Sequence, residues 1–394
     1  MLTADNCSIA QLVAPNNAAA FLKEHWESKP LLVARNDPSY FDPIVTLDDI
    51  DRAITTLQLA HPDIMLNDAS RDVKTQDYTL SSGLIDVARL YQQFARGATI
   101  ILNQLERFLP NLSMMCRALE RELSQRFQAN IYLTPKNAQG LKVHYDSHDV
   151  FVLQVSGTKH WVVYDQPVTL PYRGQSFGEN PVDPGAVSME FDLKPGDTFY
   201  LPRGVMHQAT SNDNDSLHIT VGVLQTSWTE LLIEALGRVG LDDPDFRRTL
   251  PIGFAHADFD RAAAERTFRD LLARVAKKAD FDSVLDHFAD ELVASRQFAL
   301  RGQLGQIQRL GDVTVDSRAS VRPQLLYRLR EVGESVVVYS AGGEITFPAH
   351  AGTALRHALE HEHYAIGSLP GELDDAGKLT LVRRLVREGL VRID

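Results

Sequence analysis

The stretch NIYLTPKNAQGLKVHYDSHDVFVLQVSGTKHWVVYD, residues 130–165, decides the fold and the site of this chain. It is rich in β-branched and aromatic residues and is interrupted by Gly, Pro, Asn and Asp, a pattern typical of short strands joined by turns. Within it, His144 and Asp146 stand two positions apart. Alternate side chains of a strand leave the same face, so this imidazole and this carboxylate are expected to reach one metal ion.

A second stretch, GDTFYLPRGVMH at residues 196–207, supplies a third candidate ligand, His207. Its spacing of Gly196, Pro202, Gly204 and His207 resembles the second motif of the cupin superfamily, although the Asn that follows in that motif falls one residue late, at Asn212. Two histidines and one carboxylate, with open coordination positions, form the facial triad of non-haem Fe(II) oxygenases. We therefore predict that His144, Asp146 and His207 are metal ligands and catalytic residues of an iron oxygenase.

Other histidines compete for this role. His148 and Asp149 lie close to the predicted pair, but a strand rarely directs three consecutive same-face residues at one ion, so we expect His148 at the pocket mouth. His357 and His361 have the i,i+4 spacing of a helical metal site but no third ligand at convincing spacing. A solvated helix end is the favoured interpretation of that pair.

Four further residues are candidates for binding a cofactor. Lys159 opens the strand KHWVVY, where a lysine normally lies at an edge with its ammonium in water. If Lys159 points inward instead, it could anchor a carboxylate near the metal, and this interpretation is favoured. Asn130 and Tyr132 share one strand face and could add hydrogen bonds, and His218 lies on another apolar strand, LHITV.

The composition sets limits on location and partners. A net charge of -12 argues against broad affinity for nucleic acid or anionic membranes, and 44% hydrophobic residues are ordinary for a globular protein. The two cysteines, Cys7 and Cys116, are far apart and form no CxxC pair, which fits a reducing compartment. No signal peptide or transmembrane run is recognisable, so the expected location is the cytoplasm.

The periodicity along the chain changes twice, which indicates a mixed α and β protein with three regions. Residues 1–225 end in short strands typical of a double-stranded β-helix, or jelly roll. Residues 226–308 contain three or four helices, which are broken near Pro244 and Pro251. This segment is too small to bury the apolar faces of its helices by itself. Residues 309–394 have the order of a winged helix: a hairpin at 336–347, helices at 351–360 and 376–388, and a closing strand at 390–393.

Several of these motifs together resemble the JmjC-type ribosomal oxygenases, which are 2-oxoglutarate-dependent protein hydroxylases. The resemblance is carried by HYD at 144–146, DVFVLQ at 149–154, Gly157 with Lys159, and the motif that ends at His207. It extends to the N-terminal Phe21, Trp26 and PLL at 30–32, to Asn103 with RF at 107–108, and to the order of barrel, helices and winged helix. The motifs are specific in the barrel and weak after residue 225.

The resemblance implies a JmjC/cupin barrel with Fe(II) held by the triad, 2-oxoglutarate and O2 as co-substrates, and Lys159 paired with the distal carboxylate of 2-oxoglutarate. It implies that the helical region makes a homodimer. It also implies hydroxylation of an arginine or a histidine in a protein substrate, with a ribosomal protein as the expected partner.

Alternatives remain open at this point. One is a metal-dependent cupin enzyme that does not use 2-oxoglutarate, but such cupins more often present a His-x-His pair. Another is a DNA-binding sensor that uses the winged helix, but residues 321–394 hold nine Lys or Arg against ten Asp or Glu, which disfavours DNA binding. Demethylation of methyl-lysine is a variant of the same oxygenase chemistry.

Overall fold

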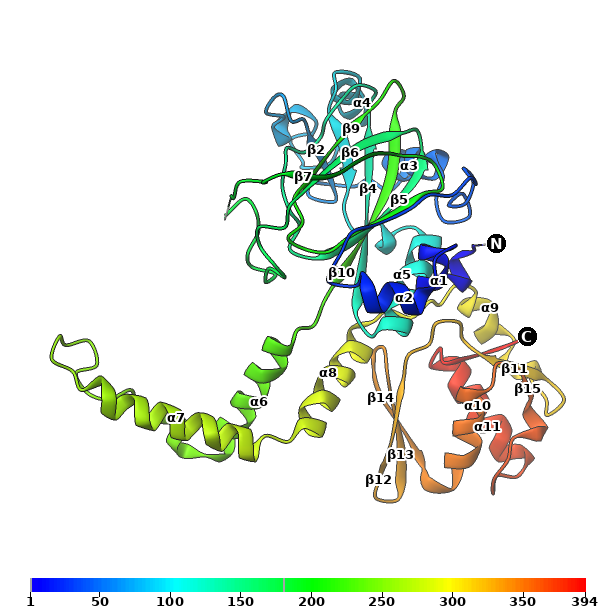
Figure 1. Ribbon diagram of the computed structural model, residues 1–394. Coiled ribbons are helices and arrows are strands. Elements are labelled where there is room, and N and C mark those ends of the chain that lie inside the picture. Colours follow the sequence, from blue (N-terminus) through cyan, green and yellow to red (C-terminus); the bar gives the residue numbers. More distant parts are fainter. Residues whose placement is uncertain (1, 180) are drawn as a thin grey trace. The chain divides into compact units, whose positions relative to one another are not determined.

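The computed structural model describes residues 2–179 and 181–394 (Figure 1). The chain divides into two compact units. The first unit comprises Met1–Gln225, Phe298–Leu325 and His350–Asp394, and the second comprises Thr226–Gln297 and Leu326–Ala349. Among the described residues, no helix is both long enough and apolar enough to cross a lipid bilayer.

A seven-stranded antiparallel sheet forms the centre of the first unit. In spatial order its strands are β1 (Leu31–Val33), β8 (Thr198–Leu201), β5 (Asp149–Ser156), β10 (Ser216–Leu224), β4 (Arg126–Thr134), β3 (Thr99–Leu102) and β2 (Ile64–Asn67). Nearly every residue of β5 and β10 is buried, which shows that both faces of the sheet are covered.

A second, three-stranded sheet covers one of these faces. Its order is β7 (Val187–Leu193), β6 (Lys159–Tyr164) and β9 (His207–Ser211). Val152 and Phe199 of the large sheet pack in one apolar cluster with Trp161 and Leu193 of the small sheet, so the two sheets face each other. The predicted barrel of short strands is confirmed.

Helices and apolar segments from the N-terminal half cover the other face. They are α1 (Ile9–Val13), α2 (Ala18–Glu24), α3 (Leu47–Thr56), α4 (Val87–Ala95) and α5 (Pro110–Leu123). Helix α3 begins with a capping box, in which Thr46 accepts a hydrogen bond from the Asp49 amide and Asp49 accepts one from the Thr46 amide. Ile50 and Ile54 of this helix belong to the large core cluster on this side of the sheet.

The C-terminal part of the first unit contains α9 (Gln303–Gln308), β11 (Arg318–Val321), α10 (Gly352–Glu360), β15 (Tyr364–Ala365), α11 (Asp375–Arg387) and β16 (Val391–Ile393). The three strands form a sheet in the order β15-β11-β16. Both predicted helices and the closing strand of this region are therefore present.

The second unit contains α6 (Trp228–Asp242), α7 (Arg261–Lys278), α8 (Phe281–Ser295) and the sheet β12 (Arg328–Val332), β13 (Ser335–Ser340) and β14 (Gly343–Pro348). Strands β13 and β14 are the predicted hairpin, and its turn residues Gly342 and Gly343 both have positive φ. This hairpin belongs to the second unit, whereas α10 and α11 belong to the first. The winged-helix arrangement stays a prediction.

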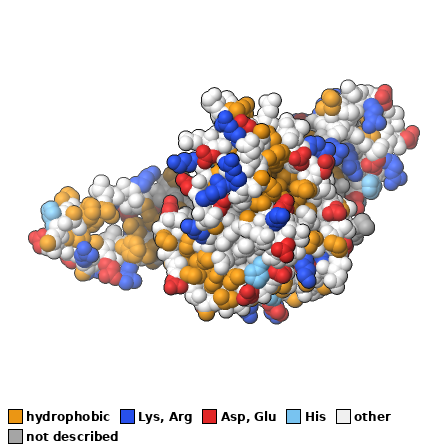
Figure 2. Space-filling view, turned by 90° about the horizontal axis from the view of Figure 1, so that it is seen from above, with side chains coloured by type: hydrophobic (Ala, Val, Ile, Leu, Met, Phe, Trp, Pro, Cys, Tyr) orange, Lys and Arg blue, Asp and Glu red, His pale blue; other side chains and the backbone are white. Residues whose placement is uncertain are grey.

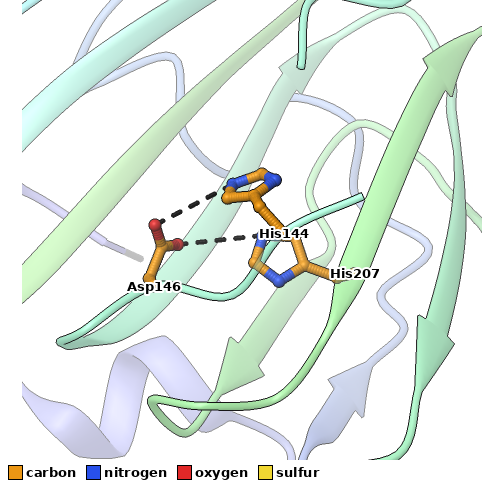
Figure 3. A group of neighbouring side chains, drawn as sticks. All are labelled: His144, Asp146 and His207. Carbon is orange, nitrogen blue, oxygen red and sulfur yellow. Dashed lines mark ion pairs between the residues drawn. The ribbon is translucent and has the colours of Figure 1, made fainter. Parts of the chain in front are cut away.

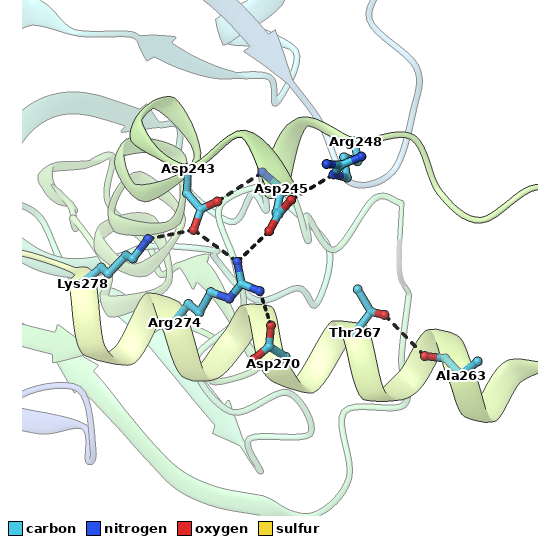
Figure 4. Close-up of polar contacts among 8 residues, drawn as sticks. All are labelled: Asp243, Asp245, Arg248, Ala263, Thr267, Asp270, Arg274 and Lys278. Atoms are coloured by element: carbon cyan, nitrogen blue, oxygen red, sulfur yellow. Dashed lines mark hydrogen bonds and ion pairs between the residues drawn. The ribbon is translucent and has the colours of Figure 1, made fainter.

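A network of ion pairs holds α7 against the end of α6 (Figure 4). Arg274 lies 2.8 Å from Asp245 and 2.6 Å from Asp270, and Lys278 lies 2.8 Å from Asp243. Asp243 follows α6 directly, where the helix ends before the short turn Pro244–Arg247. The predicted break of the helical region near Pro244 is confirmed.

Candidate metal centre

Two backbone hydrogen bonds bring the two candidate histidine ligands together. The His144 amide donates to the His207 carbonyl at 3.1 Å, and the His207 amide donates to the His144 carbonyl at 2.8 Å. This is an isolated β-bridge, so the expected strand through His144 and Asp146 does not form. Asp146 lies in a loop, where its carbonyl accepts a hydrogen bond from the Gly204 amide at 2.9 Å. His144 and Asp146 are therefore held in position by tertiary contacts with the second motif and not by a regular strand.

The two imidazole rings present the same nitrogen to the centre of the site. Nδ1 of His144 lies 2.8 Å from the Lys142 carbonyl, and Nδ1 of His207 lies 3.0 Å from the Val205 carbonyl. A carbonyl only accepts hydrogen bonds, so both Nδ1 atoms carry a proton, and Nε2 is the nitrogen that each ring, when neutral, presents to a metal ion. The Nε2 atoms of His144 and His207 lie 3.9 and 3.8 Å from the Asp146 carboxylate (Figure 3).

These donors fit one divalent transition-metal ion. The ligand atoms of the three residues lie within 4.8 Å of one another, a separation that one ion bridges after small side-chain movements. Burial alone would raise the pKa of Asp146, but the attraction of His144, His148 and His207 outweighs it and lowers that pKa. Burial and the repulsion of His144 lower the pKa of His207 to about 4. Near neutral pH the site therefore offers a carboxylate and a neutral His207 ring, the donor types that Fe(II), Mn(II) and Zn(II) accept.

The pocket beside the triad contains a buried lysine. Lys159 is only 5% exposed, and its Nζ donates to Oγ1 of Thr134 at 3.1 Å. Burial lowers the pKa of Lys159 to about 7. No carboxylate in residues 2–179 or 181–394 forms an ion pair with it. The inward orientation expected for Lys159 is confirmed, and a buried ammonium of this kind suits an anionic ligand.

Two of the other predicted residues also line this pocket. Tyr132 and His218 are neighbours across β4 and β10, and their rings stack with centroids 5.0 Å apart. Burial, and then the charge of Lys159, lower the pKa of His218 far below its usual value, which keeps its ring neutral. Asn130 is not among the lining residues, and its Oδ1 accepts a hydrogen bond from the Gln104 amide at 2.9 Å. A cofactor role for Asn130 stays a prediction.

Sequence reasoning did not single out Trp161, which also lines the pocket and is 4% exposed. Among residues 2–179 and 181–394, its indole N–H has no hydrogen-bond partner, and neither does Nδ1 of His218. Buried polar groups are normally paired, so both atoms are available to a bound ligand. Trp161 stands two positions after Lys159 in β6, and this same-face spacing was the signal that could have identified it.

The competing residues have other roles. The ring of His148 lies against Gly222, where an added Cβ would come within 2.8 Å of its Nε2. The fully buried carboxylate of Asp149 accepts hydrogen bonds from the Tyr200 hydroxyl and, at 3.2 Å, from the Arg203 amide, so it fixes the second motif to β5. Among the described residues, only His144, Asp146 and His207 form a group of three or more His, Cys, Asp or Glu side chains close enough to hold a metal ion. His357 and His361 are not part of such a group.

Comparisons with known proteins agree with this geometry. The JmjC domain family matches residues 101–231, which include the whole triad. The chain is 29% identical over 297 residues to the bifunctional lysine-specific demethylase and histidyl-hydroxylase NO66 of Aedes aegypti, a match that covers 71% of this chain and 47% of that protein. It is 33% identical over 238 residues to ribosomal oxygenase 2 of Bos taurus, which covers 58% of this chain and 50% of the relative.

Among solved structures, the Escherichia coli ribosomal oxygenase YcfD has the same fold. The match has a TM-score of 0.55 at 17% identity and covers 96% of this chain and 98% of YcfD. The chain spans about half the length of the first curated relatives it matches. Residues 101–231 therefore match the JmjC domain family, and the chain is similar to ribosomal oxygenase 2 and to NO66 over about half the length of those proteins.

Proposed function

We propose that this protein is an Fe(II)- and 2-oxoglutarate-dependent oxygenase that hydroxylates an arginine or histidine side chain of a ribosomal protein. The observation that carries the proposal is the presence, in one pocket, of a His-Asp-His triad and a buried lysine without a carboxylate partner in the described chain. The substrate class is supported by the names of the relatives, ribosomal oxygenase and histidyl-hydroxylase.

Each pocket residue has a defined task in this proposal. His144, Asp146 and His207 hold the metal through two imidazole nitrogens and one carboxylate. The Lys159 ammonium pairs with the distal carboxylate of 2-oxoglutarate, and the Trp161 N–H is an additional donor in the same pocket. When bound, the iron and 2-oxoglutarate supply the oxidation, which consumes O2, releases succinate and CO2, and adds one oxygen atom to the substrate.

The protein contributes orientation and exclusion of water. Val150 and Val152 of the large sheet line the pocket beside the triad, and both side chains are buried. Apolar walls of this kind keep solvent from the reacting centre and strengthen the interaction of Lys159 with an anion. A cupin enzyme that does not use 2-oxoglutarate has no evident need for this buried cation, so Lys159 favours the oxygenase over that alternative.

The experiment measures succinate formation from 2-oxoglutarate with added Fe(II) in air, with and without a pool of ribosomal proteins, followed by intact mass analysis. We expect succinate together with a gain of one oxygen atom on a single protein. Loss of both signals in Asp146→Ala and Lys159→Met variants would connect them to this pocket. Succinate without a mass gain would refute the ribosomal substrate, and no succinate under any condition would refute the oxygenase.

We also propose that the chain forms a homodimer through its helical region, residues 226–308. In this proposal residues 1–225 are the oxygenase domain and residues 309–394 are a winged-helix domain. The proposed location is the cytoplasm. The support is the exposure of large apolar side chains in the helical region, which water-soluble monomers rarely show in such number. They include Trp228, Leu232, Ile233, Leu241, Ile252 and Phe268.

Light scattering on the purified chain tests the dimer. We expect the mass of two chains for the wild type and for Lys277→Asp, an exposed control on α7, and a lower mass for Phe268→Asp on the same helix. A single-chain mass for the wild type would refute the homodimer. On the face seen in Figure 2, Lys and Arg side chains are interspersed with acidic and hydrophobic ones, so this face does not favour DNA as a partner.

A further inference from the structure

A groove of about 820 Å³ lies between helices α3 and α4 and the strands β3 and β4 of the first unit. It shares no lining residue with the pocket of the metal centre. Its end is closed by the turn Ser156–Gly157 and by Asn214 and Asp215, which precede β10. The groove is therefore a separate feature of the first unit, and the proposed oxygenase chemistry does not use it.

The floor of the groove is apolar because both helices turn their hydrophobic sides toward it. The apolar side chains that remain partly accessible in the floor are Phe94 of α4 and Leu133 of β4, whereas Ile50 and Ile54 of α3 form its base and are almost fully buried. Leu47, at the start of α3, also lines the groove and is 53% exposed. A floor of this composition gains free energy when a partner's aliphatic side chain covers it.

The charged groups around this floor all have the same sign. Asp48, Asp51 and Asp215 line the groove, and no Lys, Arg or His does. Within the described residues, none of these three carboxylates takes part in an ion pair. By contrast, the neighbouring Asp49 is paired with Arg52.

The contacts of these carboxylates leave their charge largely uncompensated. Asp51 accepts a hydrogen bond from the Tyr91 hydroxyl, and Asp215 accepts one from the Lys136 amide at 2.9 Å. Each of these bonds uses one neutral donor and leaves the second carboxylate oxygen available. Asp48 lies in the first turn of α3, where the helix dipole offsets part of its charge.

We infer that this groove binds an extended, basic segment of a partner polypeptide, with an aliphatic side chain on the floor and Lys or Arg side chains at the three carboxylates. Nucleic acid and anionic lipid are excluded as occupants because the carboxylates repel phosphate. A second copy of this chain is disfavoured because the homodimer proposed above uses residues 226–308, none of which lines the groove, and a second copy would have to present a basic segment to these carboxylates. The inference concerns binding alone and does not depend on the reaction at the metal centre.

The test is fluorescence anisotropy with a labelled 12-residue peptide in which leucine and lysine alternate, titrated with the full chain. We expect saturable binding that weakens as salt is added, because exposed charge pairs are screened. The triple variant Asp48→Asn, Asp51→Asn, Asp215→Asn should raise the Kd about tenfold. Each lost ion pair between a groove carboxylate and a peptide lysine should contribute a factor of about two or slightly more, and the three factors multiply. Asparagine keeps the oxygens that accept from Tyr91 and from the Lys136 amide, so the fold is preserved.

Matched controls separate the groove from general charge effects. The variant Glu24→Gln, Asp72→Asn removes exposed carboxylates outside the groove and should bind the peptide like the wild type. Leu47→Ala should weaken binding severalfold, and a peptide with serine in place of leucine should bind less tightly to the wild type.

Three results would overturn the inference. The first is no saturable binding to the wild type, and the second is an equal loss in the control variant. The third is a change in oligomeric state in the triple variant without peptide binding, which would assign the groove to a second copy. The Asp146→Ala variant should bind the peptide normally, so a failure of the proposed oxygenase activity would be seen separately.

Discussion

The buried Lys159 predicts that binding of 2-oxoglutarate is coupled to uptake of a proton. Burial lowers the pKa of Lys159 to about 7 from 10.5, so the free protein holds this side chain about half protonated at pH 7 and about one-tenth protonated at pH 8. Only the ammonium form pairs with a carboxylate, and a bound carboxylate raises the pKa again. Binding therefore takes up about half a proton at pH 7 and close to one at pH 8.

The same linkage gives the direction and size of the pH dependence. The protonated fraction is about nine-tenths at pH 6 and is lost as the pH rises through 7, so affinity is highest on the acidic side. From pH 6 to pH 8 the apparent Kd should rise about tenfold. Replacing Lys159 with methionine removes a charge-assisted contact of roughly 2 to 3 kcal/mol, or about 30- to 150-fold in Kd.

The assay is calorimetric titration of 2-oxoglutarate into the Mn(II)-loaded protein, which binds the ligand without turnover. Repeating it in buffers of different ionisation enthalpy measures the number of protons taken up. Lys159→Met should abolish the uptake, Lys159→Arg should bind with little pH dependence, and the exposed control Lys136→Met should behave like the wild type. Absence of proton uptake at pH 8, or unchanged affinity in Lys159→Met, would refute the reasoning.

Three further perturbations test other parts of the first unit. Asp146→Ala should abolish metal binding, measured by calorimetry with Mn(II), without lowering the thermal midpoint of the metal-free protein by more than a few degrees, because the side chain is 30% exposed. Asp149→Ala should destabilise the fold by roughly 2 to 3 kcal/mol in urea unfolding, because it removes the buried acceptor of the Tyr200 hydroxyl and the Arg203 amide, whereas the Arg203 guanidinium keeps its ion pair with Glu27; a loss below 1 kcal/mol would contradict this. Gly196→Ala should cost roughly 1 to 3 kcal/mol in the same assay, because Gly196 has φ of +88° and an added Cβ would lie 2.0 Å from the Asp37 carbonyl oxygen; unchanged stability would show that the turn can relax.

Local patterns were sufficient to predict much of the barrel and the three side chains that come together at the candidate metal centre. The strand that begins at Lys159 has alternating burial, and its first residue lies inward, which is the orientation that the sequence analysis favoured for an anchor of a carboxylate. The turn glycines of the second motif have the left-handed φ values that such turns require, which is why the motif identifies His207 reliably.

Features that depend on tertiary contacts were beyond the sequence. His144 is held by a single bridge to His207, and neither local propensity nor parity specifies that pairing. Trp161 in a strand has the same pattern as any core aromatic, so its unpaired N–H could not be foreseen. The acidic groove combines Asp51 with Asp215, residues far apart in the chain, and no periodic signal connects them.

The bridge between His144 and His207 also bears on how this scaffold can diversify. The two hydrogen bonds of this bridge hold His144 beside His207. The connection between β6 and β7, residues 165–186, is not part of the bridge. That connection touches the segment around Asp146 from outside, since Phe177 packs edge-on against Tyr145 and the Arg173 carbonyl accepts a hydrogen bond from Ser147. Insertions at its exposed residues, such as Gly178 and Glu179, could therefore change which substrates reach the centre while the metal geometry is inherited unchanged.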